Sequence, residues 1–442
     1  MKLQQSRLTP SETVAWLDKH VIGQDEAKRI VSIALRNRFR RRLIDEPMQS
    51  EIYPSNLIMM GPTGVGKTEI ARRMANLVGA PFIKVEATKY TETGYVGRDV
   101  EGIVRDLVRS AVNLATAKAR KEKREEAESR TIKRILVVLK KNEIISESDS
   151  DSDIEELLNE GRFDDIEIDL AITEKAIGVE VFPMIPGQGF DNQINDQMKK
   201  MLDKVIGSRR KKINLTVSEA KKKIFEEEMA KILDRGDHVQ EGLKLAQEEG
   251  IIFIDEIDKI IGSEGGSGPD VSRMGVQRDL LPLVEGCSVS TRYGTIKTDH
   301  ILFIAAGAFH GSSPANLIPE LQGRFPLRVS LSPLSEEDLL RILTEPESCI
   351  LDQYLQLLLA DNLHLVVEDL AKKEIASIAK YLNDEKEDIG ARRLRSVLSY
   401  LFEDYLFGAP DIIQGRVRLS GKKAKEKLEA LVERREEEGY IL

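Results

Sequence analysis

The chain has 442 residues, of which 41% are hydrophobic and 32% are charged, so it is too long for one ordinary core and too mixed for a fibrous or disordered protein. A formal net charge of −9 argues against a general duplex-DNA binder, and only two cysteines, Cys287 and Cys349, argue against a disulfide scaffold or a cysteine-ligated zinc site. No apolar run approaches the length of a membrane span, and residues 1–10 lack an apolar signal core, so we expect a cytoplasmic protein.

A phosphate-binding loop is predicted in the N-terminal part of the chain. The apolar run at 56–60 indicates a buried parallel strand, and residues 68–78 indicate a helix. Between them, Gly61-Pro-Thr-Gly-Val-Gly-Lys-Thr68 matches the pattern G-x-x-x-x-G-K-[ST]. The glycines let backbone N–H groups surround the phosphates, and the helix N-terminus adds partial positive charge. We expect Lys67 to reach the β- and γ-phosphates of ATP and the Thr68 hydroxyl to bind Mg²⁺.

An inserted, mobile and mostly helical domain is predicted between about 110 and 243. Charged residues cluster there, and helical periodicity comes and goes. The run at 146–156 consists of serines and acidic residues apart from Ile154 and is predicted to be a solvated, disordered loop. Residues 182–189 form another predicted loop, 199–212 are basic, and 220–233 predict a helix.

Two apolar strands are predicted after the insertion, at 251–254 and 300–304. The first is followed directly by Asp255 and Glu256. Two adjacent carboxylates therefore lie at the carboxyl end of a strand, where α/β sheets bind ligands. We expect Asp255 to hold the Mg²⁺ shell. We expect Glu256 to orient and polarise the attacking water as a general base.

Hydrolysis of ATP also requires cations for the charge that develops on the γ-phosphoryl group. Arg324 follows a loop after a predicted strand, and Arg392 starts a predicted helix. From the residues alone, a surface ion pair is at least as good an interpretation for each arginine. The chain is mostly helical from about 332, with predicted helices at 394–406 and 422–438.

Seven long motifs of the chain match one known family. They lie at 21–28, 61–68, 83–88, 93–97, 268–273, 275–286 and 317–324. Together with Gly390-Ala-Arg-Arg-Leu394, they resemble the HslU (ClpY) family in the Clp/HSP100 branch of the AAA+ ATPases. The resemblance covers nearly the whole chain. It implies an α/β AAA+ P-loop domain with a parallel sheet, formed by residues 1–109 and 244–332. It further implies an intermediate domain at 110–243 and a C-terminal α-helical domain at 333–442.

The resemblance also implies roles around a nucleotide, with ATP and Mg²⁺ as cofactors. Ile22 is expected to pack on adenine, and Arg392 to contact ATP in its own subunit as a sensor arginine. Arg324 is expected to reach the neighbouring subunit's site as an arginine finger, with Glu320 beside the same interface. The implied catalytic residues are Lys67, Glu256 and Arg324, and the implied nucleotide contacts are Ile22, Gly64, Val65, Gly66, Lys67, Thr68, Glu69, Asp255, Glu320 and Arg392.

Two segments are candidates for contacts with other proteins. From the residues alone, Gly94-Tyr95-Val96-Gly97 indicates a tight turn with one aromatic in the core, whereas the resemblance implies a pore loop that grips substrate. The segment Tyr440-Ile441-Leu442 either packs on the last helix or stays exposed as a docking peptide. In the resembled family this tail inserts between peptidase subunits, and six subunits form a ring.

One feature departs from the common AAA+ pattern, because Ile304-Ala-Ala-Gly307 offers no polar sensor residue. Three other functions fit the residues less well. A ClpX-like unfoldase usually carries a four-cysteine zinc domain, a nucleic-acid remodeller predicts a basic appendage, and a self-contained protease needs a nucleophile with an oriented base. We therefore predict an ATP-dependent protein unfoldase and translocase that delivers substrates to a separate HslV-type peptidase and activates it, without nucleic-acid or membrane partners.

Overall fold

The protein divides into two compact units, one of which is inserted into the other. The computed structural model describes residues 8–90, 99–146, 150–173, 210–234, 236–261 and 269–438. One unit joins Met1–Leu114 with Val239–Leu442, and the other comprises Ala115–His238. The sequence predicts an insertion at 110–243.

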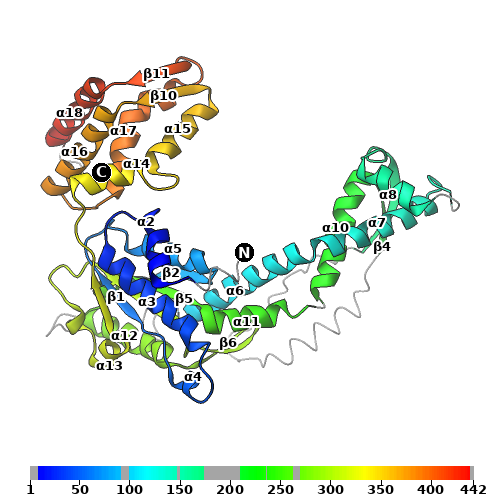
Figure 1. Ribbon diagram of the computed structural model, residues 1–442, viewed down its shortest axis with the longest axis horizontal. Coiled ribbons are helices and arrows are strands. Elements are labelled where there is room, and N and C mark those ends of the chain that lie inside the picture. The colour runs from blue at the N-terminus through cyan, green and yellow to red at the C-terminus, as the bar shows by residue number, and fades with distance from the viewer. Residues whose placement is uncertain are drawn as a thin grey trace. The chain divides into compact units, whose positions relative to one another are not determined.

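A five-stranded parallel sheet organises the first unit (Figure 1). Its strand order is β2-β5-β8-β1-β9. The strands are β1 (Leu57–Met60), β2 (Phe82–Glu86), β5 (Ile251–Asp255), β8 (Leu302–Gly307) and β9 (Leu327–Ser330). The strands predicted at 56–60 and 251–254 are confirmed, and the one predicted at 300–304 begins at Leu302. In this order β8 separates the strand that precedes the phosphate loop from the strand that ends in Asp255.

Helices cover both faces of this sheet. Successive side chains of a strand point to opposite faces, so alternate residues of β1 pack against different helices. Leu57 and Met59 pack with α3 (Asp25–Arg41) and α5 (Lys67–Val78). Ile58 packs on the other face, which is covered by α6 (Glu101–Glu122), α11 (His238–Glu249) and α12 (Pro269–Glu285). This arrangement confirms the predicted α/β fold with a parallel sheet.

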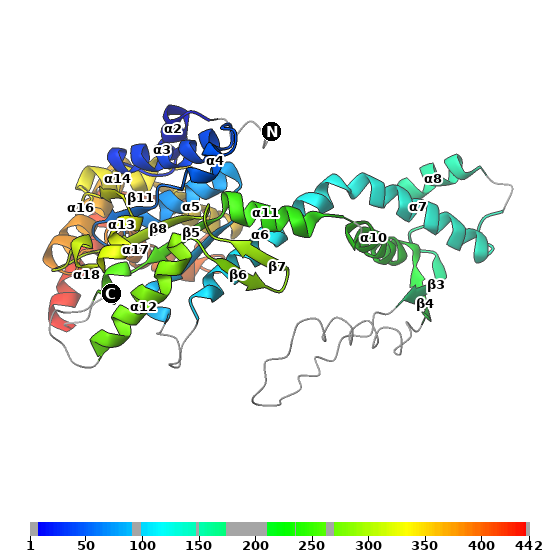
Figure 2. The same ribbon diagram turned by 90° about the horizontal axis from the view of Figure 1, so that it is seen from below.

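Short elements complete this region, including a two-stranded antiparallel hairpin that Figure 2 shows. They are α2 (Pro10–Asp18), α4 (Met48–Glu51), α13 (Pro319–Arg324), the 3-10 turns η1 (Ala87–Lys89), η2 (Ile257–Ile260) and η3 (Pro314–Asn316), and the hairpin strands β6 (Ser288–Thr291) and β7 (Gly294–Lys297).

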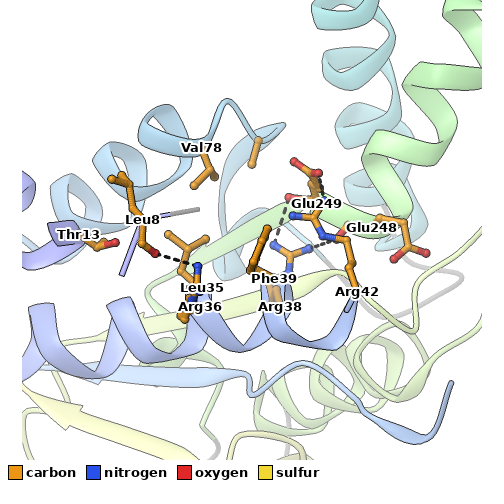
Figure 3. Close-up of a pocket in the computed structure, with 11 residues that line it drawn as sticks. Leu8, Thr13, Leu35, Arg36, Arg38, Phe39, Arg42, Val78, Glu248 and Glu249 are labelled. Atoms are coloured by element: carbon orange, nitrogen blue, oxygen red, sulfur yellow. Dashed lines mark hydrogen bonds and ion pairs between the residues drawn. The ribbon is translucent and has the colours of Figure 1, made fainter. Parts of the chain in front are cut away.

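A partly buried arginine, Arg38, closes the end of α11, where the chain enters β5. Arg38 on α3 donates to the carbonyl oxygens of Glu248, Glu249 and Gly250 at 2.8 to 3.2 Å and to that of His300 at 3.0 Å. The last carbonyls of a helix lack intrahelical partners, so a cation stabilises them. Burial lowers the pKa of Arg38 to about 10, and the guanidinium stays charged at neutral pH. Figure 3 shows Arg38 beside a hollow of about 30 Å³, which is too small for a nucleotide because ligand pockets hold roughly 300–1,000 Å³.

The inserted unit has a core of its own. Its elements besides the end of α6 are α7 (Arg124–Lys141), α8 (Asp151–Asn159), α10 (Val217–Asp234) and the antiparallel strands β3 (Glu167–Thr173) and β4 (Arg210–Thr216). Leu139, Leu158 and Ile224 are fully buried in this core. The unit is mostly helical, as predicted, and α10 confirms the helix predicted at 220–233.

The prediction of a disordered loop at 146–156 is wrong in its second half, where α8 begins at Asp151. Ile154 and Leu158 stand four residues apart, so they share one helix face and bury it in the core of the unit. Asp151 and Asp153 lie in the first turn, where negative charge is favourable for a helix. The acidic composition suggested solvent, but two apolar residues at helical spacing decide the structure.

The C-terminal part of the first unit is helical, as predicted. Its helices are α14 (Glu336–Thr344), α15 (Ile350–Ala360), α16 (Asp369–Glu385), α17 (Arg392–Gly408) and α18 (Gly421–Glu438). The last two confirm the helices predicted at 394–406 and 422–438. A parallel pair of strands, β10 (Leu363–Val367) and β11 (Gly415–Leu419), was not predicted, although β10 alternates between buried and exposed residues. None of the described helices is long and apolar enough to cross a membrane.

Candidate active site

The phosphate loop has a backbone that its glycines allow. Gly61, Gly64 and Gly66 have φ angles of 140°, 76° and 107°, which L side chains rarely adopt. Gly66 is the N-cap of α5, so the helix begins without a capping side chain and its first N–H groups suit an anion. Val65 between them is 3% exposed and anchors the loop in the core.

Lys67 already lies against this loop. Its Nζ atom donates to the carbonyl oxygens of Gly61 and Pro62 at 2.5 and 2.7 Å. Burial lowers the pKa of Lys67, and the negative charges of Asp255 and Asp258 oppose this effect. A phosphate oxygen is a stronger partner for an ammonium group than a neutral carbonyl. A phosphate of ATP can therefore replace the two carbonyls as the partner of Lys67.

Thr68 and Glu69 follow in the first turn of α5. Glu69 is bound to Arg73 at 2.6 Å and also to Arg72. Burial alone would raise the pKa of Glu69, but hydrogen bonds from these arginines outweigh burial and lower it. The carboxylate of Glu69 is therefore engaged along the helix, and its backbone N–H is the group that suits a nucleotide phosphate.

Two carboxylates stand at the carboxyl end of β5. Asp255 forms an ion pair with Lys84 at 2.7 Å and accepts a hydrogen bond from the N–H of Glu256 at 3.1 Å. Glu256 is exposed, and the Thr88 hydroxyl donates to its Oε2 at 3.5 Å. The φ angle of Glu256 is 56°, a left-handed conformation that costs a non-glycine residue roughly 1–3 kcal/mol. The surrounding fold therefore holds the predicted general base in a strained turn.

The segment expected to contact adenine lies beside the phosphate loop. Val21 and Ile22 are 5% and 4% exposed, and Val21 Cγ1 lies 3.6 Å from the place where a Cβ of Gly66 would stand. Lys28, a buried lysine on α3, holds this segment because its Nζ donates to the Val21 carbonyl at 3.1 Å and to Asp18 at 2.5 Å. The contact of Ile22 with adenine remains a prediction.

The loop before α17 touches the phosphate loop directly. The N–H of Ala391 donates to the carbonyl oxygen of Gly64 at 3.1 Å. A Cβ on Gly390 would stand 2.7 Å from the Gly64 carbonyl carbon, so this approach requires glycine. Asn383 donates to the Gly390 carbonyl at 3.1 Å, and the buried Arg393 donates to Asn383 Oδ1 at 3.2 Å. These contacts hold the segment in place.

Arg392 and Arg393 are neighbours with opposite environments. Arg393 is 1% exposed and donates to the Glu387 carbonyl at 2.8 Å, so its role is structural. Arg392 is exposed, and its positive charge contributes to the lowered pKa of Lys67, after burial. The two cations therefore lie near each other, which suits the predicted contact of Arg392 with bound ATP.

Arg324 lies at the other end of the sheet from its own phosphate loop. Its carbonyl oxygen accepts a hydrogen bond from Asn56 at 3.1 Å, and Asn56 precedes β1, whereas the phosphate loop follows β1. The Arg324 side chain is 45% exposed and pairs with Glu285 at 2.9 Å. Glu320, one turn earlier on α13, is exposed as well. Neither side chain is placed for its own site, and both are accessible to another molecule.

Two predicted sites lie outside the described residues, namely Gly94-Tyr95-Val96-Gly97 and Tyr440-Ile441-Leu442. Conversely, the sequence interpretation missed Lys28, Asn383 and Arg393, which hold the loops around the nucleotide site. A lysine in a helix that also contains five arginines carries no local signal of burial. The motif Gly390-Ala-Arg-Arg-Leu394 suggested a role for Arg392 alone, and only the burial of Arg393 shows that the two arginines differ.

Comparisons with known proteins match this chain to ATPase families. Residues 57–166 match the family model described as "ATPase family associated with various cellular activities (AAA)", and residues 181–328 match "AAA domain (Cdc48 subfamily)". The ATP-dependent protease ATPase subunit HslU of Bartonella tribocorum is 50% identical over 91% of this chain and 92% of its own. HslU of Persephonella marina is 44% identical, and the ATPase subunit ClpY of Bacillus subtilis is 43% identical, each over 100% of both chains.

Matches of this size over nearly the whole length of both partners indicate a shared fold and a shared ATPase domain. The relatives are therefore similar across the inserted unit and the C-terminal helices, and not only at the phosphate loop. We conclude that the chain is an AAA+ ATPase and belongs to the HslU (ClpY) family of protease ATPase subunits.

Proposed function

We propose that the chain is an ATP-dependent protein unfoldase and translocase that delivers substrates to a separate HslV-type peptidase and activates it. The observation that carries this proposal is the 3.1 Å hydrogen bond between Gly64 and Ala391, which joins the phosphate loop to the start of α17. A change at the phosphates can therefore reach the C-terminal helices through one contact, as a motor requires. The names of the relatives, ATP-dependent protease ATPase subunits, support a peptidase as partner.

Within one subunit, the proposed chemistry follows from the described geometry. Backbone N–H groups of the loop and the ammonium of Lys67 bind the phosphates. Glu256 orients the attacking water and accepts its proton, while Arg392 contacts bound ATP. The hydroxyl of Thr68 and the carboxylate of Asp255 are oxygen donors of the kind that Mg²⁺ prefers, and they fit this ion. Bound Mg²⁺ neutralises charge on the β- and γ-phosphate oxygens.

Neighbouring subunits are proposed to complete each site. Because Arg324 lies at the far end of its own sheet and is accessible, it serves as the arginine finger of the next subunit, with Glu320 beside the same interface. Such a head-to-tail contact closes into a ring, and we propose six subunits.

The proposed protein contacts are made by the two segments outside the described residues. Tyr95, within Gly94-Tyr95-Val96-Gly97, grips the unfolding substrate in the pore. The segment Tyr440-Ile441-Leu442 docks on the peptidase. We propose the cytoplasm as the location, where both free cysteines, Cys287 and Cys349, stay reduced.

The proposal is tested by adding an HslV-type peptidase to the purified chain with and without ATP. We expect ATP-dependent co-purification, faster cleavage of a small fluorogenic peptide, and degradation of a folded protein. Deletion of Tyr440, Ile441 and Leu442 is expected to abolish the first two effects and to leave ATP hydrolysis unchanged. A chain that hydrolyses ATP but never stimulates peptide cleavage would not be a peptidase activator, and full stimulation by the truncated chain would exclude the tail as the docking element.

A further inference from the structure

The carboxyl end of β8 lies between the two halves of the ATP site. β8 pairs with β5, which ends at Asp255, and with β1, which leads into the phosphate loop. The N–H of Gly61 donates to the carbonyl oxygen of Gly307 at 3.3 Å, so the loop starts directly beside this strand end. Ala305, Ala306 and Gly307 nevertheless provide no polar side chain at this position.

The side chain of Asp258 occupies this place from the neighbouring element η2. Its Oδ1 atom lies 2.6 Å from the point where a Cβ of Gly307 would stand, so the carboxylate fills the space that the glycine leaves. Its Oδ2 atom accepts a hydrogen bond from the N–H of Phe309 at 3.2 Å. Its negative charge also acts on Lys67, whose pKa it raises against the effect of burial.

Asp258 therefore links two residues with left-handed backbone conformations, Glu256 at the start of its own turn and Phe309 after β8. Glu256 has a φ angle of 56°, and Phe309 has a φ angle of 55°. Glu256 opens η2, where its carbonyl accepts a hydrogen bond from Lys259 at 3.0 Å, and Asp258 anchors this turn to the backbone of Phe309. Such conformations persist only where surrounding contacts hold them.

We infer that Asp258 is a positioning residue for ATP hydrolysis, because its carboxylate fills the gap at Gly307 and anchors the turn that carries Glu256. The anchor fixes the backbone turn from which the Glu256 carboxylate projects. This inference rests on the ATP site of the proposed function and is independent of any peptidase. It concerns kcat and not ATP binding, since Asp258 holds the general base and leaves the N–H groups of the loop untouched.

The test compares Asp258→Ala and Asp258→Asn in the full-length chain, without peptidase. We expect Asp258→Ala to lower kcat for ATP about 10- to 100-fold, less than the roughly 10²- to 10⁴-fold cost of losing the general base itself, because Glu256 is still present. ATP affinity, measured by direct titration, should stay within about twofold of the parent. Asp258→Asn keeps an acceptor for the Phe309 N–H and should retain most of kcat.

The control is Glu12→Ala, which removes a carboxylate that also accepts a backbone N–H, from Thr9 at 2.7 Å, in the capping box of α2. It should leave kcat unchanged. Unchanged kcat in Asp258→Ala would overturn the inference, as would an Asp258→Asn variant as impaired as Asp258→Ala. A parallel loss of ATP affinity and thermal stability in Asp258→Asn would show a purely structural role and also overturn it. Parental turnover in Glu256→Gln would instead refute the proposed general base, so the two failures are distinguishable.

Discussion

At the scale of single residues, Glu256 shows how the fold places the proposed general base. It follows Asp255 at the end of β5 in a left-handed conformation, with its carboxylate exposed and within 3.5 Å of the Thr88 hydroxyl. Asp255 is instead engaged by Lys84 at 2.7 Å. Two adjacent carboxylates therefore have different partners, which suits one for a metal shell and the other for a water molecule.

The exchange Glu256→Gln tests this division of roles. The amide keeps the size of the side chain but cannot accept a proton, so we expect turnover to fall roughly 10²- to 10⁴-fold. ATP affinity should be retained, because the phosphates are bound by the loop and by Lys67. Steady-state hydrolysis and a direct binding titration give the two values. Lys67→Ala is the matched contrast, since it should weaken binding itself, and turnover of Glu256→Gln within twofold of the parent would point to another base.

The adjacent arginines at the start of α17 allow a second test. Arg393→Ala removes a fully buried cation and leaves Asn383 Oδ1 and the Glu387 carbonyl without its hydrogen bonds, so we expect a loss of roughly 2–4 kcal/mol in stability. Arg392→Ala should change stability by less than about 0.5 kcal/mol, because the side chain is exposed. It should reduce ATP turnover by about tenfold or more. Chemical denaturation and hydrolysis rates measure both, and equal destabilisation by the two variants would contradict the assignment.

At the scale of secondary-structure elements, α3 connects the two ends of the sheet. It starts beside the segment of Val21 and Ile22 and ends at the C-terminus of α11, where Arg38 binds three helix-end carbonyls and that of His300. Arg41 on the same helix donates to His300 Nε2 at 2.5 Å. Because Arg41 can only donate, the neutral imidazole carries its proton on Nδ1, a buried atom without a hydrogen-bond partner among the described residues.

His300 makes this junction sensitive to pH. Burial lowers the pKa of His300, and the charge of Arg41 lowers it further. The unfolded chain therefore takes up the proton first, near the ordinary value of about 6.5. The contribution of His300 to stability is complete above that value and is lost as the pH falls through it towards the lower folded pKa.

We therefore expect His300→Gln to flatten the loss of stability between about pH 7.5 and pH 5.5, relative to the parent chain. Glutamine can still accept the hydrogen bond of Arg41 but does not titrate. Thermal unfolding measured across this range at constant ionic strength gives the slope. His20, whose pKa burial also lowers, contributes a slope that both proteins share. Identical pH profiles of variant and parent would show that His300 is not the titrating group.

At the scale of the whole molecule, the proposed site is incomplete in one chain. The phosphate loop, Asp255, Glu256 and Arg392 are the proposed parts of one nucleotide site, whereas Arg324 is bound to Glu285 beyond the opposite end of β1. We therefore predict that Arg324 acts between subunits and that hydrolysis requires their assembly.

Mixing experiments test this arrangement. Arg324→Ala and Glu256→Gln chains should each be inactive alone but should recover part of their turnover when they assemble together. In such rings some intact fingers face intact Glu256 side chains, so activity should rise well above the sum of the separate proteins. Mass spectrometry of the assemblies confirms that they are mixed. Mixed rings without any recovery would show that Arg324 acts within its own subunit.

The sequence by itself determined the features that are local in the chain. Gly61 to Thr68 specifies its own turn and helix start, because the glycine backbone and the apolar strand before it lie within one short segment. The strand that ends in Asp255 and Glu256, the helix at 220–233 and the helical end followed from periodicity for the same reason. The α8 helix was missed because composition outweighed the spacing of Ile154 and Leu158.

Only the tertiary structure decided how distant segments meet. The contact of Gly64 with Ala391, the burial of Arg393 beside an exposed Arg392, and the place of Asp258 at Gly307 each join parts of the chain whose pairing no local pattern encodes. For Asp258 and Gly307 the physical reason is strand order, because β8 enters the sheet between β5 and β1 and thereby places their loops side by side. For the other two it is the packing of the C-terminal helices against the phosphate loop. A motif specifies what a residue can do, whereas the packing of the sheet and its helices determines what that residue touches.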